Sequence, residues 1–388
     1  NRYADAYPWR LSPHATNLAL RANGPSYPAV CTESMVGDDD IFDVIILEYH
    51  LRAEEGLLIL ARRLRERFPD ALIIFFKIWH PFYIHHLAGG DDNNNNNKKK
   101  TAIRVGKKNR AEKRSQNFVS WAQGTLGPDV SLHGRDLKDA LLSTKEEDWA
   151  YGDQTKGDQA VEVAAKAVGG YIYELQKNPS PLQAMIHHNH WFADDFHHMS
   201  KYGHQVVAND VGRFIKKHGR RSDRVGSWGG GDACLSWFTD GHVGLPYGDD
   251  KVRLAQFGDE KYALEFPSSG GGGSVEITNP FDHDRTLYLT YMATGPAPSK
   301  YPKTNIIVTK QSEDPSHAQV VVMLDPISSI PDGHGVHVAK LSKAGVVPPG
   351  TSIIHIHPLE KTERPFRLTG ISLTSDIDAD FEVFGDQK

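Results

Sequence analysis

Asp43-Val-Ile-Ile-Leu-Glu-Tyr49 is an apolar run of strand length, typical of a parallel strand that is buried on both faces. Residues 51–68 follow with the apolar spacing of a helix, and Pro69-Asp70 ends it. Ala71-Leu-Ile-Ile-Phe-Phe-Lys-Ile78 is a second run of the same kind. A strand, a helix and a strand at this spacing predict a doubly wound parallel sheet.

The same alternation continues through the first half of the chain. Residues 159–176 and 203–217 have helical patterns, and Ala184-Met-Ile186 is a candidate short strand between them. We therefore expect an α/β domain over residues 1–221.

The pattern changes at a glycine-rich joint, residues 222–232. Beyond it, short β-prone runs are separated by turns rich in Gly, Pro and Asp, with no convincing helix between them. This pattern predicts an all-β sandwich over residues 233–388. The runs that carry the prediction are 275–278, 286–291, 305–309, 319–324, 352–357 and 381–384.

Composition excludes several classes of protein. A chain of 388 residues with 39% hydrophobic residues is long enough for two domains with real cores. Its formal net charge of -5 and pI near 6.5 argue against a nucleic-acid binder. No apolar run approaches the ~20 residues that a membrane helix needs. We expect no membrane span and no cofactor.

The two cysteines, Cys31 and Cys234, leave two alternatives. They form one disulfide if the protein is secreted, or they are two free buried thiols. We expect a secreted or extracellular protein.

Asp194-Asp-Phe-His-His-Met-Ser-Lys-Tyr-Gly-His204 contains the main functional motif of the chain. It places Asp195 three residues before His198, just ahead of a predicted helix. In such a pair the imidazole takes a proton from a nucleophile, and the carboxylate fixes its tautomer and stabilises the imidazolium. The structural alternative is a helix-capping Asp beside a surface His.

Residues 1–218 resemble the SGNH (GDSL-type) hydrolases, a flavodoxin-like family of esterases, lipases and polysaccharide deacetylases. The Asp195/His198 pair is similar to the last block of that family. Thr16-Asn-Leu-Ala-Leu-Arg-Ala-Asn-Gly24 looks like its second block, a strand followed by a glycine. The resemblance implies that the Gly24 N–H helps to form an oxyanion hole.

The chain departs from the family at two places. The third block normally supplies an Asn, and Arg52 stands there in Leu47-Glu-Tyr-His-Leu-Arg52. The first block, Gly-Asp-Ser, is absent from these residues. In the family it follows the first strand, which lies inside a flavodoxin-like sheet of order 2-1-3-4-5. We therefore expect that strand on a bound N-terminal fragment, on a segment outside this chain, or on a partner.

Two hypotheses of function follow. The first is an SGNH-type ester hydrolase or acyl-transfer enzyme on an acylated carbohydrate, with Asp195, His198, Gly24 and Arg52 in its site and the Ser upstream. The second is a catalytically inactive SGNH-fold protein that serves as a structural or interaction module in an extracellular assembly. A polysaccharide is the expected partner of the enzyme.

Histidines and aromatic residues outside this motif suggest weaker alternatives. The histidines at 80, 85 and 86, at 187–190 and at 197–198 are near one another in sequence, but no spacing matches a helical zinc motif, and we expect no metal. His355 and His357 alternate along a predicted strand and therefore share a face. We expect at least one of Trp228, Trp237 and Phe238 to be buried at a fixed domain interface; the alternative is that they stack on sugar rings.

Overall fold

The computed structural model describes residues 6–12, 14–18, 24–36, 40–50, 55–81, 84–86, 134–152, 154–193, 196, 198–219, 224–226, 232–236, 252–256, 262–267, 272–294, 299–310, 321–327 and 337–374. The chain divides into two compact units whose segments alternate along the sequence. The first unit contains Asn1–Asn17, Phe42–Ala53 and Asp70–Asp223, and the second contains Leu18–Ile41, Glu54–Pro69 and Arg224–Lys388. No described helix is long and apolar enough to cross a membrane.

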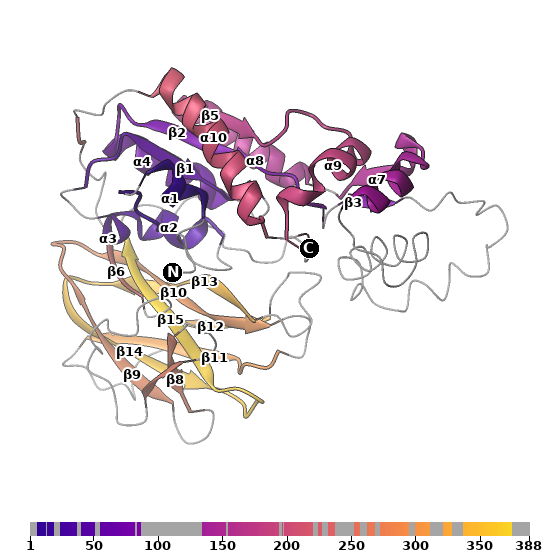
Figure 1. Ribbon diagram of the computed structural model, residues 1–388. Helices are drawn as coiled ribbons and strands as arrows, with labels where there is room; N and C mark the ends of the chain where they lie inside the picture. The colour runs from indigo at the N-terminus through magenta and orange to yellow at the C-terminus, as the bar shows by residue number, and fades with distance from the viewer. Residues whose placement is uncertain are drawn as a thin grey trace. The chain divides into compact units, whose positions relative to one another are not determined.

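The first unit is built on a parallel sheet of order β1-β2-β5 (Figure 1). Its strands are β1 (Val44–Leu47), β2 (Leu72–Lys77) and β5 (Tyr171–Glu174). β1 and β2 are the two runs that the sequence predicts, and they pair in parallel as expected. The α/β class is therefore confirmed. The flavodoxin-like order of five strands stays a prediction, because residues 19–23 of the proposed second block lie outside the described residues.

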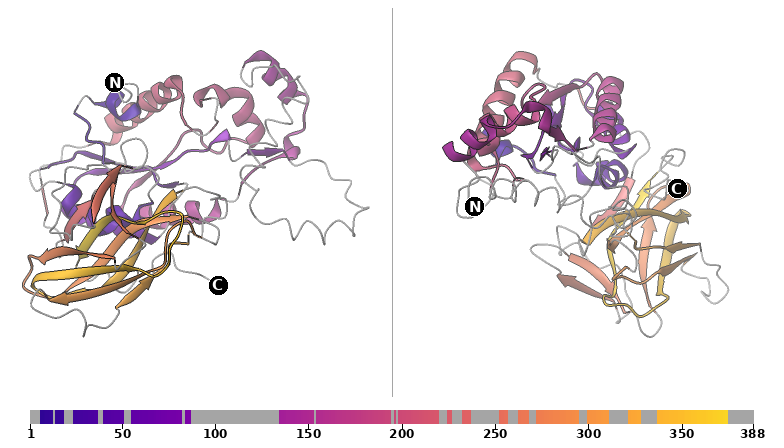
Figure 2. Two further views of the ribbon diagram at one scale, coloured as in Figure 1. Left: turned by 90° about the horizontal axis from the view of Figure 1, so that it is seen from below. Right: turned by 90° about the vertical axis from the view of Figure 1, so that its right-hand side faces the viewer.

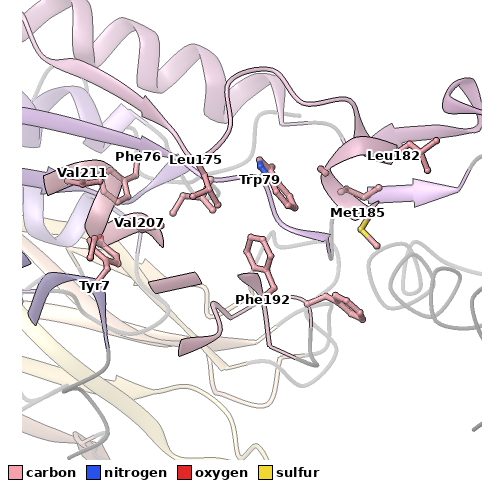
Figure 3. Packing of buried hydrophobic residues seen from close by; sticks show 14 of the residues in the cluster. Tyr7, Phe76, Trp79, Leu175, Leu182, Met185, Phe192, Val207 and Val211 are labelled. Carbon is pink, nitrogen blue, oxygen red and sulfur yellow. The ribbon is translucent and has the colours of Figure 1, made fainter. Parts of the chain in front are cut away.

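Helices cover both faces of this sheet. α1 (Tyr7–Leu11) and α10 (Lys201–His218) lie side by side (Figure 1). They share one apolar core with Leu72, Ile74 and Phe76 of β2. Figure 3 shows this core extending from Tyr7 and Val207 past Trp79 and Phe192 to Met185. α8 (Thr155–Val168) contacts β2 and β5 with a different buried stripe, in which Val161 and Ala164 lie.

Smaller elements complete the first unit. α7 (Arg135–Leu142) packs on α9 (Pro181–His188), and η5 (Asn189–Trp191) continues directly from α9. A short antiparallel pair joins β3 (Ile84–His86) to β4 (Trp149–Tyr151), which follows η4 (Glu146–Asp148).

Two local predictions are wrong. Residues 184–186 are not a strand but part of α9, because Pro181 is favourable in a first helical turn and the Ser180 hydroxyl accepts the Gln183 N–H at 3.2 Å. The helix predicted over 159–176 ends at Val168. Gly169 then takes a left-handed φ of 61°, and the aromatic-rich segment after it pairs as β5.

The second unit contains two antiparallel sheets, which form the predicted sandwich (Figure 2). The six-stranded sheet has β13 (His337–Val347), β10 (Arg285–Thr294), β15 (Phe366–Thr374), β8 (Tyr262–Phe266) and β7 (Arg253–Gln256) in that order, with β6 (Asp232–Ser236) also on β15. The four-stranded sheet has β12 (Val322–Leu324), β11 (Thr304–Lys310), β14 (Gly350–Pro358) and β9 (Gly273–Asn279). The main core of the sandwich lies between the two sheets. In it, Leu287 and Leu289 of β10 pack in one cluster with Ile354 and Ile356 of β14.

Helical segments from early in the chain belong to this second unit. They are α2 (Ser26–Val30), α3 (Thr32–Met35) and α4 (Glu55–Arg67). Every residue of β10 and β15 is buried, so the six-stranded sheet is covered on its outer face as well. Part of that cover is α2, whose Tyr27 ring lies against Gly370.

A disulfide and a buried carboxylate attach these helices to the sandwich. Cys31 and Cys234 are bonded to each other, which decides between the two alternatives left by the sequence. The Asp232 carboxylate accepts the backbone N–H groups of Glu33 and Ser34 at 3.1 and 3.0 Å and pairs with Arg63 at 2.6 Å. The boundary at 222–232 stays a prediction, because most of that joint lies outside the described residues, as do Trp228, Trp237, Phe238 and the run 381–384.

Candidate functional site

The carboxyl ends of the parallel strands carry polar and aromatic residues, and ligands bind at this edge in open α/β sheets. Glu48 follows β1 directly, and Trp79 comes two residues after β2. The buried Tyr7 donates its hydroxyl to Glu48 Oε2 at 2.8 Å, and its N–H meets His204 Nδ1 at 3.4 Å. Because His204 lies in the first turn of α10, Tyr7 places the start of α10 at the carboxyl edge of the sheet.

The surroundings of Tyr7 favour its neutral phenol. Burial, followed by the charge and hydrogen bond of Glu48, raises the pKa of Tyr7 well above its ordinary value. Burial among protein atoms also raises the pKa of Glu48, and the hydrogen bond from Tyr7 opposes that rise. Glu48 is nevertheless exposed to solvent, so water moderates the shift.

The loop that carries His198 is closed by backbone hydrogen bonds. Phe192 and Met199 form an antiparallel bridge, and the Ala193 N–H donates to the His198 carbonyl at 2.7 Å. Inside the loop Phe196 takes a φ of +54°, which is unusual for a residue other than glycine, and its ring is buried. The His198 carbonyl is thus bonded to Ala193, while the His198 side chain is exposed.

Helix α10 begins at this loop with a regular cap. The Ser200 hydroxyl accepts the Gly203 N–H at 3.0 Å, and the Ser200 N–H donates to the Trp191 carbonyl at 2.8 Å. The cap thereby joins α10 to η5 immediately after His198.

The structure describes only part of the predicted catalytic set. His198 is in the loop before α10, as the motif indicates, but Asp195 and Arg52 lie outside the described residues. Gly24 is half-buried in the segment before α2 and belongs to the second unit. The geometry of these four residues as one site therefore stays a prediction.

A second polar cluster lies at the same edge of the sheet. His50 is 6% exposed, and its Nε2 lies 2.8 Å from Asp158 Oδ1. Lys77, the last residue of β2, binds the same oxygen at 2.9 Å and lies 3.4 Å from Glu174, the last residue of β5. The Nδ1 atom of His50 is buried and has no partner among the described residues. Sequence analysis missed this cluster, although Lys77, a charged residue at the end of an otherwise apolar predicted strand, was a signal for it.

The charges in this cluster stabilise one another. Burial alone would raise the pKa of Asp158, but the hydrogen bonds from Lys77 and His50 outweigh it and lower this pKa below its usual value. Burial would lower the pKa of Lys77, and its bonds to Asp158 and Glu174 raise it instead. The cluster joins α8 to β2 and β5 through these contacts.

No metal site is found in the described part of the chain, where no three His, Cys, Asp or Glu side chains form a group suited to an ion. His355 and His357 do share a face of β14, as predicted, with ring centroids 6.3 Å apart. The Thr309 hydroxyl lies 3.0 Å from His355 Nε2. His197 and the side chains of His85 and His86 lie outside the described residues.

Comparisons with known proteins find likeness only among solved structures. No family model matches the sequence, and no curated protein matches it significantly. A two-domain esterase (CEX) active on acetylated mannans aligns with 96% of this chain and 86% of its own, at 12% identity and a TM-score of 0.46. CsCBM6-3 from Clostridium stercorarium, in complex with cellobiose, aligns with 36% of this chain and 92% of its own, at 10% identity and a TM-score of 0.25.

Proposed function

We propose that this chain is an SGNH-type ester hydrolase that acts on an acylated carbohydrate. The observation that carries the proposal is the His198 loop. It presents an exposed imidazole at the start of α10, and Tyr7 joins that start to Glu48 at the carboxyl end of β1. In an enzyme built on an open parallel sheet, the catalytic base is expected at the carboxyl edge, because ligands bind there.

The residues take the following roles in the proposal. His198 accepts the proton of a serine hydroxyl as the serine oxygen attacks the ester carbonyl, and it then donates that proton to the departing sugar hydroxyl. Water attacks the acyl-serine in the second half of the reaction and releases the acid. Asp195 orients the imidazole, while the Gly24 N–H and the Arg52 guanidinium stabilise the oxyanion.

The serine is proposed to lie on a segment upstream of this chain. Among the described residues β1 pairs only with β2, and no described strand lies along the other edge of β1. An unpaired edge of a parallel sheet is normally covered. A further parallel strand there, from an N-terminal fragment or a partner, would bring the serine to the carboxyl edge.

The test compares the protein carrying its upstream segment with its His198→Ala variant on nitrophenyl acetate and on an acetylated oligosaccharide. We expect the variant to be slower by at least ~10³, the scale seen when a triad member is lost. His283→Ala, which removes an exposed histidine between β9 and β10, is the matched control and should keep the wild-type rate. Equal rates for wild type and His198→Ala would exclude the proposal.

A catalytically inactive structural or interaction protein is the second candidate, and Arg52 favours it. Loss of one oxyanion donor typically costs ~10²–10³ in rate. In that case the protein with its upstream segment shows no hydrolysis above the His198→Ala background. Both candidates fit an extracellular location, which the Cys31–Cys234 disulfide supports.

A further inference from the structure

We propose that five aromatic side chains beside the His198 loop form a subsite for the neutral sugar rings of a polysaccharide. We name this set the aromatic strip, and it consists of His187, His188, His190, Trp191 and Tyr202. The inference rests on the proposed function, because it gives the ester substrate its position.

The rings of the aromatic strip form a continuous series. The His190 ring lies 5.0 Å from the Tyr202 ring and 6.3 Å from the Trp191 ring, measured between centroids. Trp191 is 4.0 Å from His188, which in turn is 6.1 Å from His187. The side chains come from α9, η5 and the first turn of α10, three elements that follow one another closely in the chain.

The aromatic strip is anchored on the carboxyl end of β2. The buried Trp79 lies 6.3 Å from both His188 and Trp191 and 5.1 Å from Phe192. Figure 3 shows Trp79 and Phe192 close together in the core. The inner rings are thus held by the core, while the outer ones reach solvent.

The aromatic strip is joined to the His198 loop by short hydrogen bonds. The Ser200 hydroxyl donates to the His190 carbonyl at 2.9 Å, and the Ser200 N–H donates to the Trp191 carbonyl at 2.8 Å. Ser200 is two residues after His198. A ligand on the strip is therefore held at a defined place relative to the His198 backbone.

The chemistry of the aromatic strip suits a neutral hydroxylated ring. Tyr202 is 55% exposed, and His187 and His190 are exposed as well. Burial, followed by the charges of His187 and His190, lowers the pKa of His188 to about 4, so this inner imidazole is uncharged at neutral pH. Each ring combines an apolar face with a polar edge that can form hydrogen bonds. A sugar has the matching combination of C–H faces and hydroxyl edges, whereas a purely apolar partner would leave the polar edges unpaired.

The experiment measures binding of unacylated cellopentaose and mannopentaose to the full chain by titration calorimetry. We expect Tyr202→Ala and Trp191→Ala to weaken binding about tenfold or more, the loss typical of a truncated aromatic anchor. Tyr202→Phe keeps the ring and should bind within about threefold of wild type. Circular dichroism reports whether each variant is folded.

The matched control is Tyr171→Ala. Tyr171 is also an exposed aromatic, 42% exposed, and its ring lies 5.1 Å from His218 at the other end of α10. This variant should bind like wild type. Wild-type affinity in the Tyr202→Ala/Trp191→Ala double variant would overturn the inference, because binding would then take place elsewhere. Absence of binding to the wild-type protein would overturn it as well.

The same assay separates this inference from the proposed function. His198→Ala should bind both pentasaccharides as wild type does, since no bond is broken in the measurement. If the protein hydrolyses no ester but loses sugar binding with the Tyr202→Ala change, the subsite stands and the esterase proposal fails. If it hydrolyses esters but the strip variants bind normally, the esterase proposal stands and the subsite fails.

Discussion

Gly203 lies directly against the carbonyl group of Trp191: a Cβ atom at Gly203 would come within 1.9 Å of that oxygen. The absence of a side chain allows the first turn of α10 to approach η5 this closely. The contact also sets the position of the His198 loop, which connects the two elements.

We expect Gly203→Ala to destabilise the protein by about 1–3 kcal/mol, the cost of forcing atoms into a packed region. Urea unfolding measures this change. Gly212→Ala is the matched control in the same helix, because its Cβ would lie 3.7 Å from Leu11, an ordinary contact. It should be neutral or stabilising by up to about 1 kcal/mol. Equal effects of the two substitutions would contradict the close approach.

Tyr7→Phe should lower the free energy of unfolding by about 1 kcal/mol. The change removes the hydroxyl that donates to Glu48 at 2.8 Å while keeping the buried ring stacked on Phe76. Denaturant titration at neutral pH measures the loss. Tyr202→Phe removes the hydroxyl of an exposed tyrosine and should change stability far less. A Tyr7→Phe protein as stable as wild type would show that the bond to Glu48 contributes nothing.

Asp158→Asn should make the protein less stable at neutral pH, with a loss that fades in acid. The pKa of Asp158 is lowered in the folded state, so its carboxylate stabilises the fold above its unfolded pKa of about 3.9. That contribution is lost as the pH falls through the lower, folded pKa. The melting temperatures of wild type and variant should therefore approach each other as the pH is lowered below about 4.

The partner of Asp158 acts in the opposite pH range. The pKa of Lys77 is raised in the folded state, so its stabilising contribution is complete below about 10.4 and is lost as the pH rises through the folded value. The control for Asp158→Asn is Asp139→Asn, on the exposed surface of α7. The difference in melting temperature between this control and the wild type should be the same at every pH. A constant gap between Asp158→Asn and wild type at every pH would rule out the ionic contribution.

Reduction of the Cys31–Cys234 disulfide should lower stability by about 2–5 kcal/mol, the usual effect of removing a native bridge. Unfolding curves with and without a reductant measure the loss. Reductant should not change the unfolding curve of the double variant Cys31→Ala/Cys234→Ala. We expect the reduced protein to stay folded, because Asp232 still bonds Glu33, Ser34 and Arg63. An unchanged curve in reductant would show that the bridge does not constrain the unfolded chain.

Local pattern was sufficient for much of the fold. The apolar runs that begin at residues 43 and 71 became β1 and β2, because a strand buried on both faces needs unbroken hydrophobicity. Turn-rich, β-prone runs likewise predicted the sandwich. The prediction failed where a short apolar run fits both a strand and a helix, as residues 184–186 do. The cap at Ser180 makes this run part of a helix.

The sequence by itself determined the class of the two folds, the Asp-x-x-His motif and the helix that follows it, because these depend on neighbours along the chain. Only the tertiary structure decided which distant residues meet. Tyr7 reaches Glu48 across 41 residues, His50 reaches Asp158 across 108, and Cys31 reaches Cys234 across 203. No periodicity encodes such pairs, since they depend on how whole elements pack to bury their apolar faces.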